Sequence, residues 1–219
     1  MRNNNKLVSN RKNDTKQEKV LNDYLFKNYF KPLNPTSQLV FDKDLQIAGV
    51  DVEITTKNGE KKYIDIKAQS SKKYVNNPKP TYILELSSLN RHGDDFVGWF
   101  LNEELITDYY TFVWIPKAKV NEKLEIVSPD DIEEVEVMTV NKSTLKKYIL
   151  SILGDRNIQD IVAQMRKNEL TKLPLTNGIH FSHTPTLFEK PVNLVVKKHI
   201  LKKFAINHYY IKQGKLIKI

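Results

Sequence analysis

The chain has 219 residues, of which 40% are hydrophobic, so it can bury a core of its own. It contains no cysteine, which excludes a disulfide scaffold, thiolate catalysis and cysteine-ligated zinc or iron–sulfur centres. Its 35 Lys and Arg against 26 Asp and Glu give a formal charge of +9, which favours a polyanionic partner.

The hydrophobic pattern and the first residues bear on location. No apolar run approaches the ~20 residues that a membrane span needs, so we expect no membrane partner. Residues 1–12 are polar and basic without a hydrophobic stretch, unlike a secretory signal. We therefore expect a disordered basic arm over 1–13, in a cytoplasmic protein.

A first helix is predicted from Asp14-Thr15, as a cap, to about Phe30, with Lys31-Pro32 at its end. One helical stripe is apolar and consists of Val20, Leu21, Tyr24 and Leu25. Glu18 lies three residues before Leu21, at the margin of the core-facing side. Extended segments are predicted at 38–41 and from Leu45 onward.

Two alternating segments on either side of a turn predict a β-hairpin. In the first, Val50, Val52 and Ile54 alternate with Asp51 and Glu53, and in the second Ile64, Ile66 and Ala68 alternate with Asp65, Lys67 and Gln69. If the apolar sides share one core, the opposite side gathers three carboxylates, an ammonium and an amide. A solvent-facing sheet does not need that grouping for stability, so it indicates a functional site.

Two loop lengths compete for the register of this hairpin. A two-residue Asn58-Gly59 loop pairs position 51 with 66 and sets the polar side of one strand against the apolar side of the other. A three-residue loop that starts at Lys57, with Gly59 left-handed, pairs 51 with 65. We expect the second register. Asp51 then opposes Asp65, which is destabilising unless a cation such as a divalent metal lies between them.

Further strands and a helix are predicted after an exposed basic loop at 70–80. A strand at 81–86 precedes a helix at 94–104 and a strand at 109–115, which Pro116 ends. Lys72 and Lys73 lie in the basic loop.

Strands at 124–127 and 135–140 flank an acidic segment, 122–136, in which Lys123 is the only cation. We expect this segment to lie away from any basic groove. Helices follow at 141–153 and 155–168. The tail from Glu189 carries a further expected helix with four lysines, which are Lys197, Lys198, Lys202 and Lys203.

The arrangement of Asp51 and Asp65-Ile66-Lys67 on consecutive strands, after a helix that carries Glu18, resembles the PD-(D/E)xK nuclease superfamily. The predicted order of helix, antiparallel strands, helix and strand over about 14–115 matches the core of that family. Departures are Val50 in place of a proline, an aspartate where glutamate is commoner, and an additional strand before the second helix. The resemblance implies an α/β fold with a restriction-endonuclease-like core, a mixed sheet with an antiparallel hairpin flanked by helices.

The resemblance also implies a metal site and a reaction. Asp51, Asp65 and the carbonyl of Ile66 would bind Mg²⁺ or Mn²⁺, which are hard ions that take oxygen ligands. The metal would lower the pKa of a bound water, and Lys67 would orient or deprotonate the attacking water. The expected function is metal-dependent hydrolysis of phosphodiester bonds in DNA, most simply as an endonuclease.

Other residues complete this interpretation. Glu18 resembles a helix-borne glutamate that contacts the metal through water in some members, and Gln69 continues the functional face. Glu53 is a less secure neighbour, because a glutamate on an outer strand face is most often a surface residue. For nucleic-acid binding we expect Lys72, Lys73, Lys197, Lys198, Lys202 and Lys203.

The expected organisation is a nuclease core over 14–140 and a helical, basic C-terminal elaboration over 141–219, packed as one domain. Cutting both strands needs two sites, so a homodimer is one expected assembly. The main alternative function is a non-catalytic nucleic-acid-binding protein or regulator. A third is an interaction protein that binds a basic partner through 122–136. His180 and His183 lack a third ligand and are interpreted as incidental.

Overall fold

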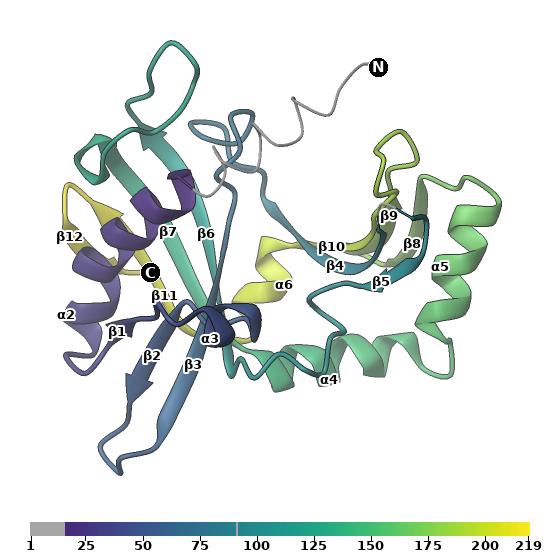
Figure 1. Ribbon diagram of the computed structural model, residues 1–219, viewed down its shortest axis with the longest axis horizontal. Helices are drawn as coiled ribbons and strands as arrows, with labels where there is room; N and C mark the ends of the chain where they lie inside the picture. The colour runs from purple at the N-terminus through teal and green to yellow at the C-terminus, as the bar shows by residue number, and fades with distance from the viewer. Residues whose placement is uncertain (1–15, 91) are drawn as a thin grey trace. The chain divides into compact units, whose positions relative to one another are not determined.

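The computed structural model describes residues 16–90 and 92–219, which divide into two compact units. The first unit contains the described residues up to Lys79, Thr107–Val140 and Ala205–Ile219, and the second contains Pro80–Ile106 and Asn141–Phe204. Each unit has its own sheet (Figure 1). The α/β class is confirmed, with a mixed sheet in the first unit and an antiparallel sheet in the second.

The first unit is built on a seven-stranded sheet in the order β1-β2-β3-β6-β7-β11-β12. Its strands are β1 (Gln38–Leu39), β2 (Val52–Thr55), β3 (Lys61–Ala68), β6 (Tyr109–Ala118), β7 (Ile132–Asn141), β11 (Ala205–Lys212) and β12 (Lys215–Lys218). Strands β3 and β6 are parallel, whereas β2 is antiparallel to β3 and β11 is antiparallel to β7.

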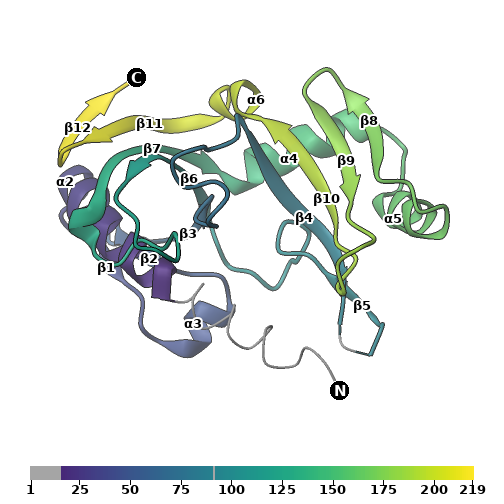
Figure 2. The ribbon, with the colours of Figure 1, turned by 90° about the horizontal axis from the view of Figure 1, so that it is seen from above.

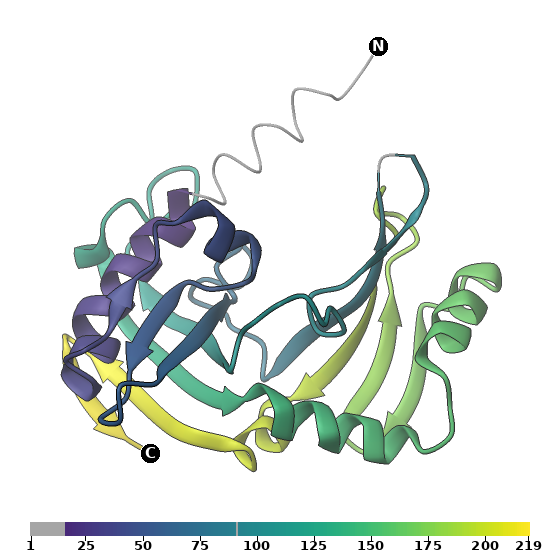
Figure 3. The ribbon, with the colours of Figure 1, turned by 60° about the horizontal axis from the view of Figure 1, so that its bottom comes forward.

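A helix over residues 16–25 continues through a π-helical turn, η1 (Phe26–Phe30), into α2 (Lys31–Leu33) and covers one face of this sheet (Figures 1 and 3). The four predicted stripe residues, Val20, Leu21, Tyr24 and Leu25, are all buried in the core beneath it. The wider turn brings Tyr29 and Phe30 into the core together, and the Tyr29 hydroxyl lies 2.8 Å from Thr139 Oγ1. The predicted cap at Asp14-Thr15 lies outside the described residues, and the helix passes Pro32 and ends at Leu33.

The β2–β3 hairpin has the predicted register. Thr55 pairs with Lys61 and Val52 with Ile64, while the Thr56 amide donates to the Glu60 carbonyl at 2.8 Å. Gly59 has φ +80°, in the left-handed region, so the loop contains the three predicted residues. Val52 and Ile64 are buried in the core under the helix, as the alternation predicted.

The second unit contains a five-stranded antiparallel sheet in the order β5-β4-β10-β9-β8. Its strands are β4 (Thr81–Leu89), β5 (Asp95–Val97), β8 (Lys172–Thr176), β9 (Ile179–His183) and β10 (Val192–Lys197). Its helices are α4 (Lys142–Leu153), α5 (Ile158–Lys167) and α6 (Lys198–Lys202), with α4 lying along the sheet in Figure 2. Asn141 and Asn157 cap α4 and α5, and Gly154 ends α4. Helices were predicted at 141–153 and 155–168, and the second begins three residues later than predicted.

The division into units differs from the predicted contiguous domains 14–140 and 141–219. Strands β4 and β5 belong to the second unit because β4 pairs with β10, and β11 and β12 return to the first unit because β11 pairs with β7. The region 141–219, expected to be helical, also contains five strands in its described structure, β8 to β12.

Some predicted elements are wrong in type. Residues 94–104, expected as a helix, contain β5 and turns because Asn90 Oδ1 accepts the His92 and Asp94 amides, and this turn folds the chain back onto β4. Gly98 directly follows β5, and a Cβ there would collide with the Glu85 carbonyl of β4, so the chain lies very close to β4 at this point. The segment after Leu45 begins in α3 (Lys43–Ile47), capped by Asp42.

Two strand boundaries also differ. Residues 124–127 form no strand because Asn121 Oδ1 accepts the Lys123 and Glu125 amides in a turn, before η2 (Pro129–Asp131). Strand β6 continues through Pro116 to Ala118, since a proline removes one donor without forbidding extended backbone. Within residues 16–90 and 92–219, no helix has the length and apolar content to cross a membrane.

The acidic segment has more cationic partners than the sequence indicated. Glu133 pairs with Lys117 at 2.7 Å and Glu134 with Lys212 at 2.9 Å. Glu125 lies 3.4 Å from Lys72, so the acidic segment reaches the basic loop instead of lying away from it. These cations come from distant parts of the chain, which is why Lys123 alone was visible in the local sequence.

Candidate active site

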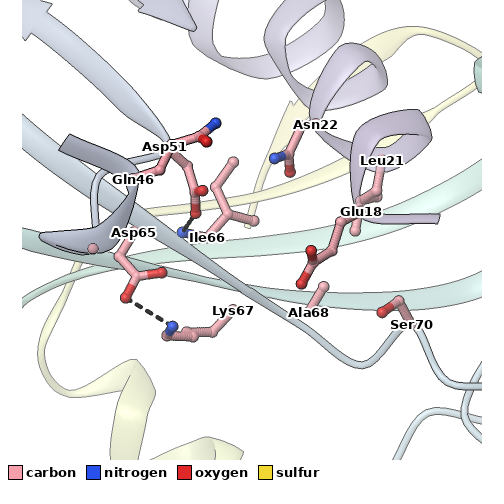
Figure 4. A pocket seen from close by; sticks show the side chains of 11 residues that line it. Glu18, Leu21, Asn22, Gln46, Asp51, Asp65, Ile66, Lys67, Ala68 and Ser70 are labelled. Atoms are coloured by element: carbon pink, nitrogen blue, oxygen red, sulfur yellow. Dashed lines mark hydrogen bonds and ion pairs between the residues drawn. The ribbon is translucent and has the colours of Figure 1, made fainter. Parts of the chain in front are cut away.

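A cavity of 190 Å³ opens beside the start of β2 and the second half of β3 (Figure 4). The helix over 16–25 contributes one wall, α3 with its connection to β2 a second, and β3 with Ser70, two residues beyond its end, a third. The polar residues on these walls are Glu18, Asn22, Gln46, Asp51, Asp65, Lys67 and Ser70.

Asp51 is the residue directly before β2 and lies beside β3. Its amide donates to the Ile64 carbonyl at 2.9 Å, and its carboxylate Oδ2 accepts the Ile66 amide at 2.7 Å. The side chain thus takes the place of a backbone acceptor at this edge of β3. Because the N–H and C=O of one strand residue point to the same side, the Ile66 carbonyl is directed to the side where Asp51 lies.

Asp65 and Lys67 are two residues apart on β3 and therefore share a face. Lys67 Nζ lies 2.8 Å from Asp65 Oδ2, as the dashed line in Figure 4 shows. The Asp65 side chain is only 5% exposed and that of Lys67 is 24% exposed. The ammonium is the more accessible partner, and it remains in reach of a ligand in the cavity.

The two aspartates share a poorly solvated environment. Burial raises the pKa of Asp65 to about 6, an increase that Lys67 opposes and the neighbouring Asp51 carboxyl group reinforces. Burial also raises the pKa of Asp51, although the Ile66 amide and Lys67 favour its charged form. Each carboxyl group is among the causes of the other's shift, so the two side chains are neighbours, as the register predicted.

The outer predicted residues have different surroundings. Glu18 lines the same cavity as the aspartates, which fits a role at a distance from them. Glu53 does not line the cavity; its side chain is 15% exposed and forms an ion pair with Lys61 at 3.0 Å.

Gln69 does not line the cavity. Its Oε1 accepts the Lys79 amide at 2.8 Å and its Nε2 donates to the Lys79 carbonyl at 3.3 Å. Gln69 is therefore not brought together with Asp51, Asp65 and Lys67 at the cavity, and its catalytic role stays a prediction. Strand β3 ends at Ala68, so the alternation of faces no longer determines where Gln69 points.

The six predicted DNA-binding lysines are divided between the two units. Lys72 and Lys73 are exposed on the loop after β3 in the first unit. In the second unit, Lys197 ends β10, α6 contains Lys198 and Lys202, and Lys203 follows α6. Their contribution to DNA binding stays a prediction.

The chemistry of the central donors fits a hard divalent ion. Asp51, Asp65 and the Ile66 carbonyl supply only oxygen atoms, and a cation would offset the burial of the two carboxylates. Among the described residues, no three His, Cys, Asp or Glu side chains form a metal-binding group. A complete ligand shell would therefore include the Ile66 carbonyl and solvent or phosphate oxygens.

His180 and His183 give no sign of a metal site. Both lie on β9, and their odd spacing on a strand directs the side chains to opposite faces. Burial lowers the pKa of each imidazole.

Sequence reasoning missed three polar residues on the cavity wall. Asn22 follows Glu18 by four residues, so helical periodicity could have placed the two together. Gln46 and Ser70 lie at the end of α3 and after β3, where no periodic pattern exists.

Comparison with protein-family models, curated proteins and solved structures found no match to this chain.

Proposed function

We propose that this chain is a metal-dependent nuclease that hydrolyses phosphodiester bonds in DNA. The observation that carries the proposal is the adjacency of Asp51 and Asp65 at one cavity, with Lys67 Nζ 2.8 Å from Asp65. A protein that only binds nucleic acid gains nothing from two adjacent carboxylates, that of Asp65 buried and that of Asp51 half-buried, at the place where a phosphate would approach.

The arrangement of elements in the first unit supports the resemblance to the PD-(D/E)xK superfamily. A helix covers an antiparallel β2–β3 hairpin, and β6 lies parallel to β3 on its other side. The chain departs from the expected order between β3 and β6, where the second unit contributes β4 and β5 instead of a helix. The restriction-endonuclease-like core is therefore part of the proposal.

The roles follow from the surroundings of each side chain. Asp51, Asp65 and the Ile66 carbonyl would hold the metal ion, which when bound supplies an acidic water and neutralises charge on the phosphate. Asp51 is held in place by the Ile66 amide. Lys67 orients the attacking water or takes its proton, and it keeps the buried Asp65 in the charged form that binds a cation.

A plasmid-nicking assay tests the proposal. The parent chain is expected to relax supercoiled DNA with Mg²⁺ or Mn²⁺ and to lose this activity in EDTA. Asp51→Asn, Asp65→Asn and Lys67→Met should each reduce the rate by at least about 100-fold, the lower end of the effect of a general acid or base. Glu53→Gln is the matched control, because it makes the same carboxylate-to-amide change on the same hairpin outside the cavity.

One observation favours the alternative of a non-catalytic nucleic-acid-binding protein. Lys67 already neutralises Asp65, and no third acidic side chain joins the pair among the described residues. In this case the parent would bind DNA without cutting it in either metal, and Asp65→Asn would leave binding unchanged.

A further inference from the structure

The basic loop, predicted at 70–80 and taken from here on as residues 69–79, which Gln69 and Lys79 close, leads away from the candidate active site. It begins at the end of β3, and Ser70 still lines the cavity. The loop contains three lysines, Lys72, Lys73 and Lys79, and no acidic residue. All three lysines are exposed.

The two ends of this basic loop are held together by one side chain. The side-chain amide of Gln69 accepts a hydrogen bond from the Lys79 N–H at 2.8 Å and donates one to the Lys79 carbonyl at 3.3 Å. The Gln69 backbone amide also donates to the Val113 carbonyl of β6 at 3.0 Å. Gln69 thus closes the loop and fixes it to the sheet.

The middle of the loop is attached to the end of β6. Asn76 Nδ2 donates to the Ala118 carbonyl at 3.0 Å, and Asn76 Oδ1 accepts the Ala118 amide at 2.7 Å. Asn76 has φ +63°, and its amide donates to the Ile115 carbonyl at 3.0 Å. Val75 is 6% exposed and belongs to the core. A loop with so many fixed points has a defined shape although it contains no regular structure.

The lysines at the tip are held outward. The Lys72 side chain is 50% exposed and 3.4 Å from Glu125, and Lys73 Nζ lies 4.9 Å from the centre of the Tyr74 ring. The Glu125 side chain is only 17% exposed, whereas half of the Lys72 side chain faces solvent, so Lys72 is the partner that a phosphate can reach. Glu125 keeps the lysine extended and competes with a phosphate for it.

We infer that the basic loop is a preformed contact surface for the sugar–phosphate backbone of the strand to be cut, with Gln69 and Asn76 as its positioning residues. The choice of ligand rests on the proposed function. Seven residues separate Asp65 from Lys72, so the two lie at most about 25 Å apart. One strand of a duplex carries a charge every ~3.4 Å along its axis, so the loop reaches phosphates within about seven nucleotides of the cleaved bond.

Binding of a fluorescein-labelled DNA oligonucleotide by the full chain, measured by anisotropy in EDTA, tests this assignment without cleavage. Lys72→Ala with Lys73→Ala should lower the slope of log affinity against log salt by about two, one for each phosphate contact. The matched control is Lys215→Ala with Lys218→Ala, two exposed lysines on β12, an edge strand of the same sheet. Glu125→Gln should strengthen binding.

The role of Gln69 is read from a double-mutant cycle. Gln69→Ala should weaken binding, and removal of Lys72 and Lys73 should then cost less affinity than in the parent, because a loosened loop no longer presents them. Three outcomes would overturn the assignment. The first is that the variant without Lys72 and Lys73 keeps the same salt dependence as the β12 control. The others are additive effects in the double-mutant cycle and no DNA binding by the parent at low salt. If the chain binds as described and cuts no DNA, the loop assignment stands and the proposed hydrolysis fails.

Discussion

The Asp65 carboxyl group is unfavourable for folding at neutral pH. Its residue is 3% exposed, and burial raises its pKa to about 6 in spite of the nearby Lys67 ammonium. The folded protein must hold this group charged above that pH, which costs free energy that a surface aspartate does not cost. Strongly shifted groups of this kind are concentrated at functional sites.

Replacing Asp65 with Asn should therefore stabilise the fold at neutral pH while it abolishes cleavage. Between about pH 3.9, the unfolded pKa, and about pH 6 the folded protein binds more protons, so the free energy of unfolding falls as pH rises. Above pH 6 the whole penalty applies, up to about 3 kcal/mol. Urea unfolding of parent and variant should show a difference that grows between pH 4 and pH 6 and is constant above.

Glu53→Gln is the control for this experiment, since Glu53 lies outside the cavity. A stability difference between parent and Asp65→Asn that is the same at pH 4.5 and pH 7.5 would mean that the carboxyl group is solvated in the folded chain.

Metal binding should depend on pH for the same reason. A cation binds the ionised carboxylates, and protons compete with it below the Asp65 pKa of about 6. At pH 5 about one tenth of Asp65 is ionised, so the Kd for Mn²⁺ should be about tenfold weaker than at pH 7. Calorimetric titration of the parent measures this. Asp51→Asn and Asp65→Asn should remove the binding, and binding retained in both variants would place the ion elsewhere.

At the scale of elements, the β2–β3 hairpin determines whether the site exists, because a shift of one residue would move Asp65 and Lys67 to the opposite face. Thr56 and Glu60 are joined by a backbone hydrogen bond, so Thr55 and Lys61 form the next, non-hydrogen-bonded pair. Cysteines at such a pair are close enough for a disulfide.

Thr55→Cys with Lys61→Cys should form this disulfide under mild oxidation. The chain has no cysteine of its own, so loss of free thiols reports the bond directly. The crosslinked protein should be more stable by about 2 to 3 kcal/mol and should keep its nicking activity, since neither position lines the cavity. Thr55→Cys with Lys62→Cys is the mismatched pair, and equal crosslinking of both pairs would contradict the register.

The hairpin and the helix above it are the elements that the sequence predicts well. Both depend on short-range signals, namely the apolar stripe that includes Leu21 and Leu25 and the Gly59 turn. The same signals predicted Asp51, Asp65 and Lys67 together. Gln69 was misplaced because its direction depends on contacts with Lys79 beyond the strand.

At the scale of the whole molecule, the first unit is assembled from three separate pieces of chain. Nothing local in the sequence indicates that Ala205–Lys212 joins β7, because the pairing partners are more than 60 residues apart. That pairing is well fixed, since Ile211 is fully buried and the Tyr210 hydroxyl donates to Glu134 at 2.6 Å. The C-terminal segment is part of the core sheet, not an elaboration of it.

Two truncations should therefore differ sharply in their effect on folding. Ending the chain after Phe204 removes β11 and β12 and exposes the edge of β7. The loss of Ile211 burial alone costs about 1.5 to 3 kcal/mol, and the lost strand pairing adds to it, against a total stability of about 5 to 15 kcal/mol for a typical domain. We expect this chain to be insoluble or to melt without a cooperative transition.

Ending the chain after Gly214 removes only the edge strand β12, whose residues are mostly exposed, and should leave a folded protein with a modestly lower Tm. Circular dichroism melts of the two chains measure the difference, and a cooperative transition after the first truncation would show that β11 is dispensable to the sheet.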